Sequence, residues 1–309
     1  MLLASFVFAM MGVCVKLAAE LYTTSEIVMY RGMMGAAMLF ALSRVRGDSL
    51  RTTLPWAHVT RGVIGVSALW LWFYSIGRLP LAMSMTLNSM SPIWIAVILL
   101  GGAWWRGRDR LEWGCAVAVL ASFAGVTLLL QPSMQASQWF AACMALASSM
   151  ISALAYLQVR KLGQLGEPEY RVVFYFSVTG AIAGALGSMV TPWVAPAQVA
   201  WHAHTPYGML LLAGVGVSAT VAQMAMTRAY RLGHPLVTAN LQYTGIVFSS
   251  IWGILLWSDV LGWMGWLGIA VILASGSAAT FYNARSRPAP APVPAPAAAS
   301  ARDPIAAEL

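Results

Sequence analysis

Charged residues are scarce in this sequence. Only 9% of its 309 residues are Asp, Glu, Lys or Arg, whereas 60% are hydrophobic. Soluble domains carry about 25% charged residues, so this chain has too little polar surface to cover a water-soluble globule. The excess of apolar residues also excludes an intrinsically disordered protein. The composition therefore indicates a polytopic membrane protein, in which the net charge of +8 reports orientation across the bilayer and does not indicate nucleic-acid binding.

Residues that usually catalyse reactions or bind metals are also few. The three cysteines lie within apolar runs and show neither metal-ligand spacing nor a disulfide framework. All ten carboxylates fall in predicted loops, in the tail or at helix ends, and the four histidines lie at the edges of apolar segments. A zinc enzyme, an intramembrane aspartyl protease or a lipid-modifying enzyme would need a cluster of such residues. We therefore expect no enzymatic activity, no cofactor, no metal and no proton coupling through a buried carboxylate.

Long apolar segments alternate with short polar breaks along the chain. A helix needs about 20 mostly apolar residues to cross the hydrocarbon core of a membrane. Ten segments meet this requirement, at residues 1–19, 26–43, 57–76, 81–103, 111–130, 138–158, 170–191, 206–228, 235–256 and 260–282. Residues 284–309 are rich in Pro and Ala and predict a disordered cytoplasmic tail. The predicted fold is thus an all-α polytopic membrane protein with ten transmembrane helices.

The distribution of basic residues supports this number of spans. With ten spans, fifteen of the 18 Lys and Arg residues fall on one side of the membrane and one, Arg78, falls on the other. The remaining two, Lys16 and Arg31, lie within predicted helices. Because basic residues gather in cytoplasmic loops, the pattern predicts a multi-pass protein of a bacterial inner membrane with both termini in the cytoplasm.

The two halves of the chain resemble each other, at one constant offset for the third to fifth spans and at an offset near 143 residues for the earlier helices. A shift of 153 residues places Arg78 on Arg231 and Trp113 on Trp266, and the register holds from the end of the third span through the fifth. It predicts a first repeat at residues 1–130 and a second at residues 131–283. Each repeat holds five helices, an odd number, so the second enters the membrane upside down. Inverted repeats recur in secondary transporters, where the solute binds near the midplane between the halves.

The fourth span carries Leu-Ala-Met-Ser-Met-Thr-Leu-Asn-Ser-Met-Ser-Pro-Ile at residues 81–93, and the fifth begins with Trp113-Gly114 and ends with Ala-Gly-Val at 124–126. These segments resemble ten-helix EamA-type transporters of the drug/metabolite transporter superfamily, and the resemblance covers about residues 1–282. Arg31 also resembles an arginine often found in the second span, whereas Gly245 and Asp259 depart from the family pattern. The resemblance implies transport of a small organic solute. Within the superfamily, the aromatic and methionine content is similar to that of bacterial exporters of amino acids, aromatic ones in particular.

Polar and aromatic residues at depth in the first half are candidate solute contacts. Asn88 and Ser91 lie three residues apart on one face of the fourth span, and Pro92 frees a backbone carbonyl one turn earlier. These groups either bind a polar head group or hold neighbouring helices together. Trp70 and Tyr74, at i and i+4 of the third span, either form an aromatic wall for the solute or pack as ordinary large rings.

The second half offers a matching set of candidates. Tyr156 lies in the sixth span, Gln223 in the eighth, and Asn240 and Tyr243 in the ninth. By pseudo-symmetry, the last two oppose the polar residues of the fourth span. Arg31, little more than a turn inside the second span, either holds a substrate carboxylate or locks its helix to a neighbour.

These observations favour a secondary transporter that works by alternating access, with the first, third, fourth, sixth, eighth and ninth spans around a central cavity. Export of amino acids, including aromatic ones, is the favoured activity. One alternative is uptake or exchange of a nucleoside-like or cationic metabolite such as S-adenosylmethionine, and an alternative of another class is a passive channel. The expected partners are the solute and membrane lipid, with no nucleic acid. The sequence leaves the oligomeric state open and is compatible with a monomer.

Overall fold

The computed structural model describes residues 1–79, 81–105, 138–194 and 201–257, with scattered positions within 117–124 and 262–278. Within these residues the chain is helical and contains no strand. The helices are α1 (Leu2–Ala18), α2 (Thr24–Arg46), α3 (Pro55–Arg78), α4 (Leu81–Asn88), α5 (Ser91–Trp105), α7 (Trp139–Gln164), α8 (Glu169–Val194), α9 (Pro206–Leu232), α10 (Pro235–Asn240), the 3₁₀ helix η2 (Leu241–Tyr243) and α11 (Thr244–Trp257).

Four of the described helices, α3, α7, α8 and α9, are each long and apolar enough to cross a membrane. The predicted all-α membrane fold is therefore confirmed. The first to fourth and the sixth to ninth predicted spans each coincide with described helices. The fifth and tenth predicted spans and the tail at 284–309 fall largely or wholly outside the described residues, so the total of ten spans and the repeat boundaries stay predictions.

The helices begin and end at residues whose chemistry favours those positions. The Thr23 side chain accepts a hydrogen bond from the backbone of Glu26, and the Glu26 carboxylate accepts one from the backbone of Thr23, which forms a capping box at the start of α2. Pro55 and Pro206 lie in the first turns of α3 and α9, where a missing N–H breaks no helical bond. The end of α2 is set by Gly47, whose φ of 72° favours glycine.

The fourth and ninth predicted spans are interrupted helices, a feature that the simple count of spans did not predict. The first interruption separates α4 from α5 at Ser89 and Met90, directly before Pro92. Proline has no N–H, so Pro92 cannot donate the hydrogen bond that the carbonyl of Asn88 would receive in a continuous helix. The second interruption is the 3₁₀ segment η2 between α10 and α11. Both breaks lie at equivalent positions, because Ser89 and Gln242 are 153 residues apart.

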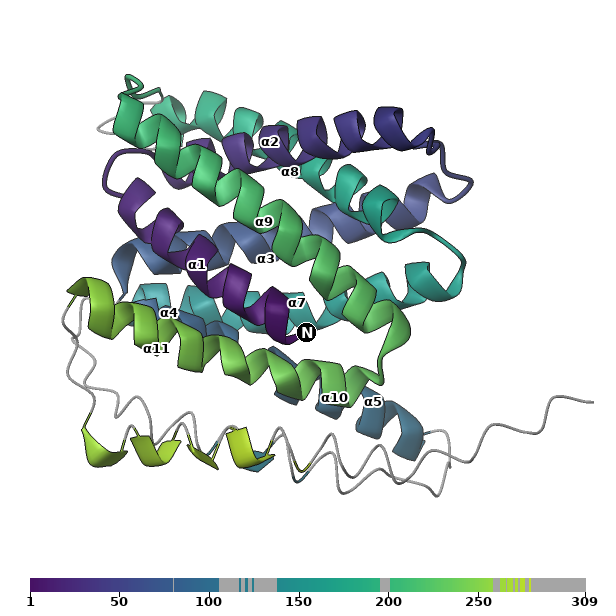
Figure 1. The fold of residues 1–309 in the computed structure, drawn as a ribbon, viewed down its shortest axis with the longest axis vertical. Coiled ribbons are helices and arrows are strands. Elements are labelled where there is room, and N and C mark those ends of the chain that lie inside the picture. Colours follow the sequence, from purple (N-terminus) through teal and green to yellow (C-terminus); the bar gives the residue numbers. More distant parts are fainter. Residues whose placement is uncertain are drawn as a thin grey trace, which may run out of the picture.

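The helices of each half pack mainly on helices of the other half. The same pairs of contacts are found when each helix is replaced by its equivalent in the other half. In the first half α1 packs on α9, and in the second half the equivalent α7 packs on α3. In the same way α2 contacts α9 as α8 contacts α3, and α2 and α8 lie side by side (Figure 1). Most of the core therefore lies between the halves. This packing also places the interrupted spans against helices of the opposite half. Helix α4 contacts α7 and α11, and helix α10 contacts α5.

Glycines set the close contact between α2 and α8. A Cβ at Gly32 would lie 2.3 Å from the backbone nitrogen of Ala181, and a Cβ at Gly184 would lie 2.4 Å from that of Met29. Residue numbers along α2 rise while those of the facing α8 residues fall, so the two equivalent helices run antiparallel. This direction is the one that an inverted relation between the halves requires. Small residues at such crossings allow backbones in a membrane to approach and gain van der Waals contact.

Candidate functional site

A small cavity lies where the two interrupted spans meet. We call it the central cavity, and its volume is about 60 Å³. It is lined by Met1, Ser5 and Phe8 of the first span, Trp72 of α3, Met85, Asn88 and Ser89 of the fourth span, Tyr156 of α7, Met226 of α9, and Gln242 and Gly245 of the ninth span. In this conformation the cavity has room for only a few water molecules. A small organic solute can enter only when the surrounding helices move apart.

Hydrogen bonds around the central cavity join the halves. The hydroxyl of Ser148 on α7 lies 2.9 Å from Oδ1 of Asn88. The Ser91 hydroxyl at the start of α5 lies 3.2 Å from Oε1 of Gln242, whose amide nitrogen in turn donates to the hydroxyl of Tyr230 on α9. The Tyr230 ring stacks on Tyr156, with 5.2 Å between the ring centroids. Neutral amides and hydroxyls next to aromatic faces thus surround the cavity.

Trp72 adds a hydrogen-bond donor that no described residue uses. Its indole Nε1 is buried, and the structure gives it no hydrogen-bond partner among the described residues. The side chain lines the central cavity. Because a buried N–H without a partner costs free energy, a solute oxygen in the cavity would gain from accepting this hydrogen bond.

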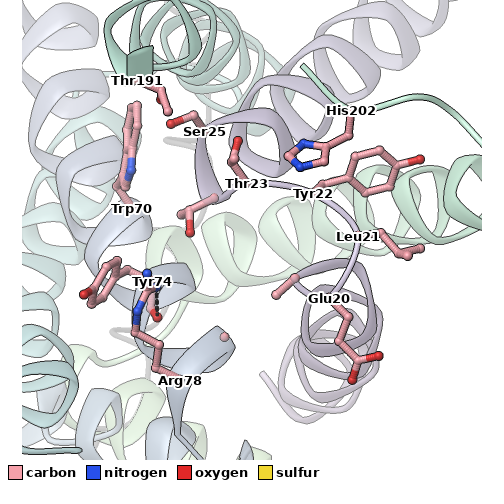
Figure 2. Close-up of a pocket in the computed structure, with 13 residues that line it drawn as sticks. Glu20, Leu21, Tyr22, Thr23, Ser25, Trp70, Tyr74, Arg78, Thr191 and His202 are labelled. Atoms are coloured by element: carbon pink, nitrogen blue, oxygen red, sulfur yellow. Dashed lines mark hydrogen bonds between the residues drawn. The ribbon is translucent and has the colours of Figure 1, made fainter. Parts of the chain in front are cut away.

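A larger opening lies at the end of the bundle that carries the α1–α2 turn. We call it the vestibule; its volume is about 660 Å³, and it is lined by residues 19–25, Trp70, Tyr74, Gly77, Arg78, Thr191 and His202. Figure 2 shows Trp70 and Tyr74 of α3 across from Thr23 and His202. The Arg78 guanidinium lies 3.7 Å from the Tyr74 ring centroid. The vestibule therefore has an aromatic wall formed by Trp70 and Tyr74, one of the two roles that the sequence left open for them, with polar groups opposite.

The predicted site residues divide between these places. Asn88 and Tyr156 line the central cavity, and Ser91 contacts its lining through Gln242. Four other predicted residues, Gln223, Asn240, Tyr243 and Arg31, line neither the central cavity nor the vestibule.

Those four residues are buried inside the bundle. Gln223 lies in α9, and Asn240 donates a hydrogen bond of 3.3 Å to the carbonyl of Ser275. Tyr243 has no exposed surface, and its hydroxyl has no partner among the described residues. Arg31 lies against Phe176 of α8.

Sequence reasoning missed Gln242, Ser89 and Trp72. A signal for Gln242 exists, because the offset of 153 residues that relates the halves places it on Ser89, at the first interruption. No sequence signal separates Trp72 from the tryptophans that only pack, since its role depends on the rotation of α3.

Two contacts between a glutamate and a histidine join different halves at opposite ends. Glu26, at the start of α2, has no exposed surface, and its carboxylate oxygens lie 2.8 Å from the backbone nitrogen and 2.8 Å from Nδ1 of His202. Glu167, between α7 and α8, lies 3.4 Å from Nε2 of His58 at the start of α3. The sequence placed Glu26 at a helix end but did not predict its burial. Within the described part of the chain, no three His, Cys, Asp or Glu residues come together as a metal site would require.

Comparisons with known proteins point to transport. The pattern of the EamA-like transporter family matches residues 1–131 and 139–278. The chain is 32% identical to the pseudopaline exporter CntI of Pseudomonas aeruginosa over an alignment of 262 residues. This alignment covers 84% of this chain and 86% of the exporter. It is 25% identical to a riboflavin transporter of Rhizobium johnstonii (78% and 76% covered) and 20% identical to an S-adenosylmethionine uptake transporter of Rickettsia bellii (73% of each). A known crystal structure shares the fold, with a TM-score of 0.71 at 17% identity over 92% of this chain and 96% of that chain.

Proposed function

Because the chain belongs to the EamA-like transporter family, we propose that it is a secondary transporter that moves amino acids, aromatic ones included, out of a bacterial cell by alternating access. Both termini would lie in the cytoplasm, and the vestibule would then open to the outer side. Members of the family and the relatives named above are transporters of small organic solutes, which supports a role in transport and not in catalysis.

The observation that carries the proposal is the meeting of two interrupted spans at the central cavity. Irregular backbone inside a membrane protein is tolerated where it is buried or lines a cavity, and discontinuous helices form the binding sites of many transporters. Here Asn88 and Ser89 at one break and Gln242 at the other line the same cavity. The equivalent positions of the breaks support two related end states, as alternating access needs.

The chemistry around the two openings supports an amino acid as cargo. A zwitterionic head group binds to hydrogen-bond donors and acceptors, and Asn88, Gln242 and the indole N–H of Trp72, which has no partner among the described residues, supply them. An apolar or aromatic side chain needs rings and sulfur atoms to pack against, which Tyr156, Met85 and Met226 provide at the same cavity.

Other cargo and a channel are the alternatives that an assay must separate. The stacked Tyr156 and Tyr230 rings also suit a nucleoside-like solute such as S-adenosylmethionine or riboflavin. A passive channel needs a continuous aqueous path, and the small volume of the central cavity in this conformation argues against one.

The test is uptake of labelled phenylalanine into proteoliposomes that contain the full-length protein, with unlabelled amino acids, S-adenosylmethionine and riboflavin as competitors. We expect saturable uptake. Asn88→Ala and Gln242→Ala should each raise the half-saturating concentration about tenfold, the effect of losing one hydrogen bond of about 1.4 kcal/mol. Ser67→Ala is the matched control, because this exposed hydroxyl bonds only to the carbonyl of Val63 in its own helix. Unchanged half-saturation and maximal flux in both cavity variants would contradict the assignment of the site.

A further inference from the structure

Two arginines lie buried in the bundle around one aromatic ring. Arg31 of α2 and Arg61 of α3 are 3% and 2% exposed. Their Cζ atoms lie 5.0 Å and 4.3 Å from the centroid of the Phe176 ring on α8. The positive-inside count placed Arg61 among the cytoplasmic residues, whereas the structure places its side chain in the interior.

Neither guanidinium has a counter-charge among the described residues. The ion pairs of this part of the chain involve Arg171 and Arg231 but not Arg31 or Arg61. Nε of Arg31, and Nε and Nη1 of Arg61, are buried without a hydrogen-bond partner. Lys16 shows the ordinary solution for a cation in a span, since its Nζ donates to the carbonyls of Ile76 and Leu79.

An unpaired charge inside a membrane protein is costly, and a second charge of the same sign nearby adds to that cost. Buried charges are therefore normally paired or mark a functional site. The stacking on Phe176 offsets part of the cost but leaves Nε of Arg31, and Nε and Nη1 of Arg61, without a partner among the described residues. The two guanidinium groups next to Phe176 have five N–H donors each. The planar arrangement of these donors matches the two oxygens of a carboxylate.

The surroundings of Arg61 make room for its head group and connect it to the central cavity. A Cβ at Gly65, one turn along α3, would lie 1.8 Å from Nη1 of Arg61 and 2.9 Å from the Phe176 ring. Only glycine at this position leaves space for the guanidinium. The Arg61 side chain also lies near Tyr156, which lines the central cavity. His58 and Arg31 also lie close enough to feel the charge of Arg61, and the neighbouring Glu167 carboxylate accepts hydrogen bonds from Arg171 and Thr52.

We infer that Arg31 and Arg61 form an anion site that binds a carboxylate of the transported solute when α2, α3 and α8 move during transport. This inference rests on the proposed function for the identity of the solute and narrows its class to amino-acid-like metabolites with a free carboxylate, dicarboxylates above all. It disfavours purely cationic cargo. In the conformation described here the site is closed.

Binding is tested with succinate as the probe on the purified full-length protein in nanodiscs of zwitterionic lipid. Melting temperatures are compared in succinate, in chloride at equal ionic strength, and in neutral succinamide. At a hundredfold excess over its dissociation constant, succinate should raise the melting temperature by roughly 5 °C, and succinamide should not. Arg31→Gln and Arg61→Gln should remove this shift. Arg46→Gln, an exposed arginine at the end of α2, is the control and should keep it.

Two further comparisons separate an anion site from a structural clamp. Without succinate, Arg61→Gln should melt at or above the wild-type temperature, because an unpaired buried charge has been removed. Gly65→Ala keeps both charges but fills the space of Nη1, so it should lose the succinate shift as well. A lower melting temperature for Arg61→Gln together with an unchanged succinate shift would overturn the inference.

Lipid phosphate is the other source of an anion, and a further arm addresses it. If phosphatidylglycerol in the nanodisc stabilises the wild type but not Arg61→Gln, and succinate then adds no further stabilisation, the occupant is a lipid and the solute assignment is wrong.

Transport measurements separate this inference from the proposed function. If no solute shows saturable uptake but the succinate shift requires both arginines, the anion site stands and the proposed function falls. If uptake saturates while the succinate shift is unchanged in both arginine variants, the proposed function stands and the anion site falls.

Discussion

At the scale of single residues, Glu167 shows how the fold holds one buried carboxylate. Its side chain is 4% exposed and accepts hydrogen bonds from Thr52 (2.6 Å) and Arg171 (2.9 Å). Burial opposes ionisation of this carboxyl, but the two hydrogen bonds and the positive charge of Arg171 outweigh it and lower the pKa of Glu167 below its ordinary value. A carboxyl with a lowered pKa stabilises the folded protein above its unfolded pKa, and this contribution is lost as the pH falls through the folded pKa.

Glu167→Gln should therefore destabilise the protein at neutral pH and matter less in acid. At pH 7 we expect a loss of about 1.5–3 kcal/mol, the range for hydrogen bonds to a charged group. The difference from wild type should begin to shrink as the pH falls below the ordinary pKa of a glutamate, about 4.3, and should disappear once the carboxyl of the folded wild type is protonated. Melting temperatures in detergent across this pH range check the prediction. The control is Glu169→Gln, which removes one partner of a more exposed ion pair with Arg231 and should lower the stability less. An equal deficit at both ends of the range would contradict the assignment.

At the scale of elements, the interruptions differ in how far the sequence could predict them. Pro92 indicates the break between α4 and α5, because a missing N–H has a fixed consequence. The break at η2 has no proline, and Gly245 stands three residues after Gln242 in a span that reads as one apolar segment. Only the offset between the halves could have placed it. The directions of side chains beyond the breaks were more difficult to predict, because a shift of one residue turns a side chain by about 100° around a helix.

The crossing of α2 and α8 leads to a prediction on stability. Gly184→Ala places a Cβ 2.4 Å from backbone atoms of Met29, which cannot give way as a flexible side chain could. The helices must separate, and a loss of at least about 1–3 kcal/mol is expected for such overpacking. Gly101→Ala is the matched control, because a Cβ there meets nothing within 4 Å. Thermal melting of both variants checks the prediction, and equal melting temperatures would show that the crossing can relax.

At the scale of the whole molecule, helices of one half pack chiefly on the other, with α2 antiparallel to its equivalent α8 (Figure 1). The sequence could predict the repeat because an offset is a property of the chain. It could not place Arg61 or Glu26 in the interior, because their burial depends on which helices of the other half cover them. The same arrangement places one glutamate–histidine contact between the halves at each end.

A carrier with its binding site between inverted halves exposes that site to one side at a time. The direct measurement is counterflow in proteoliposomes preloaded with unlabelled phenylalanine and then given labelled phenylalanine outside. Our account predicts that label accumulates transiently above its equilibrium level and that its initial rate saturates, because a bound solute carries the site back across the membrane. Label that equilibrates without overshoot, at a rate that rises linearly with concentration, would mean a continuous pore and would contradict alternating access.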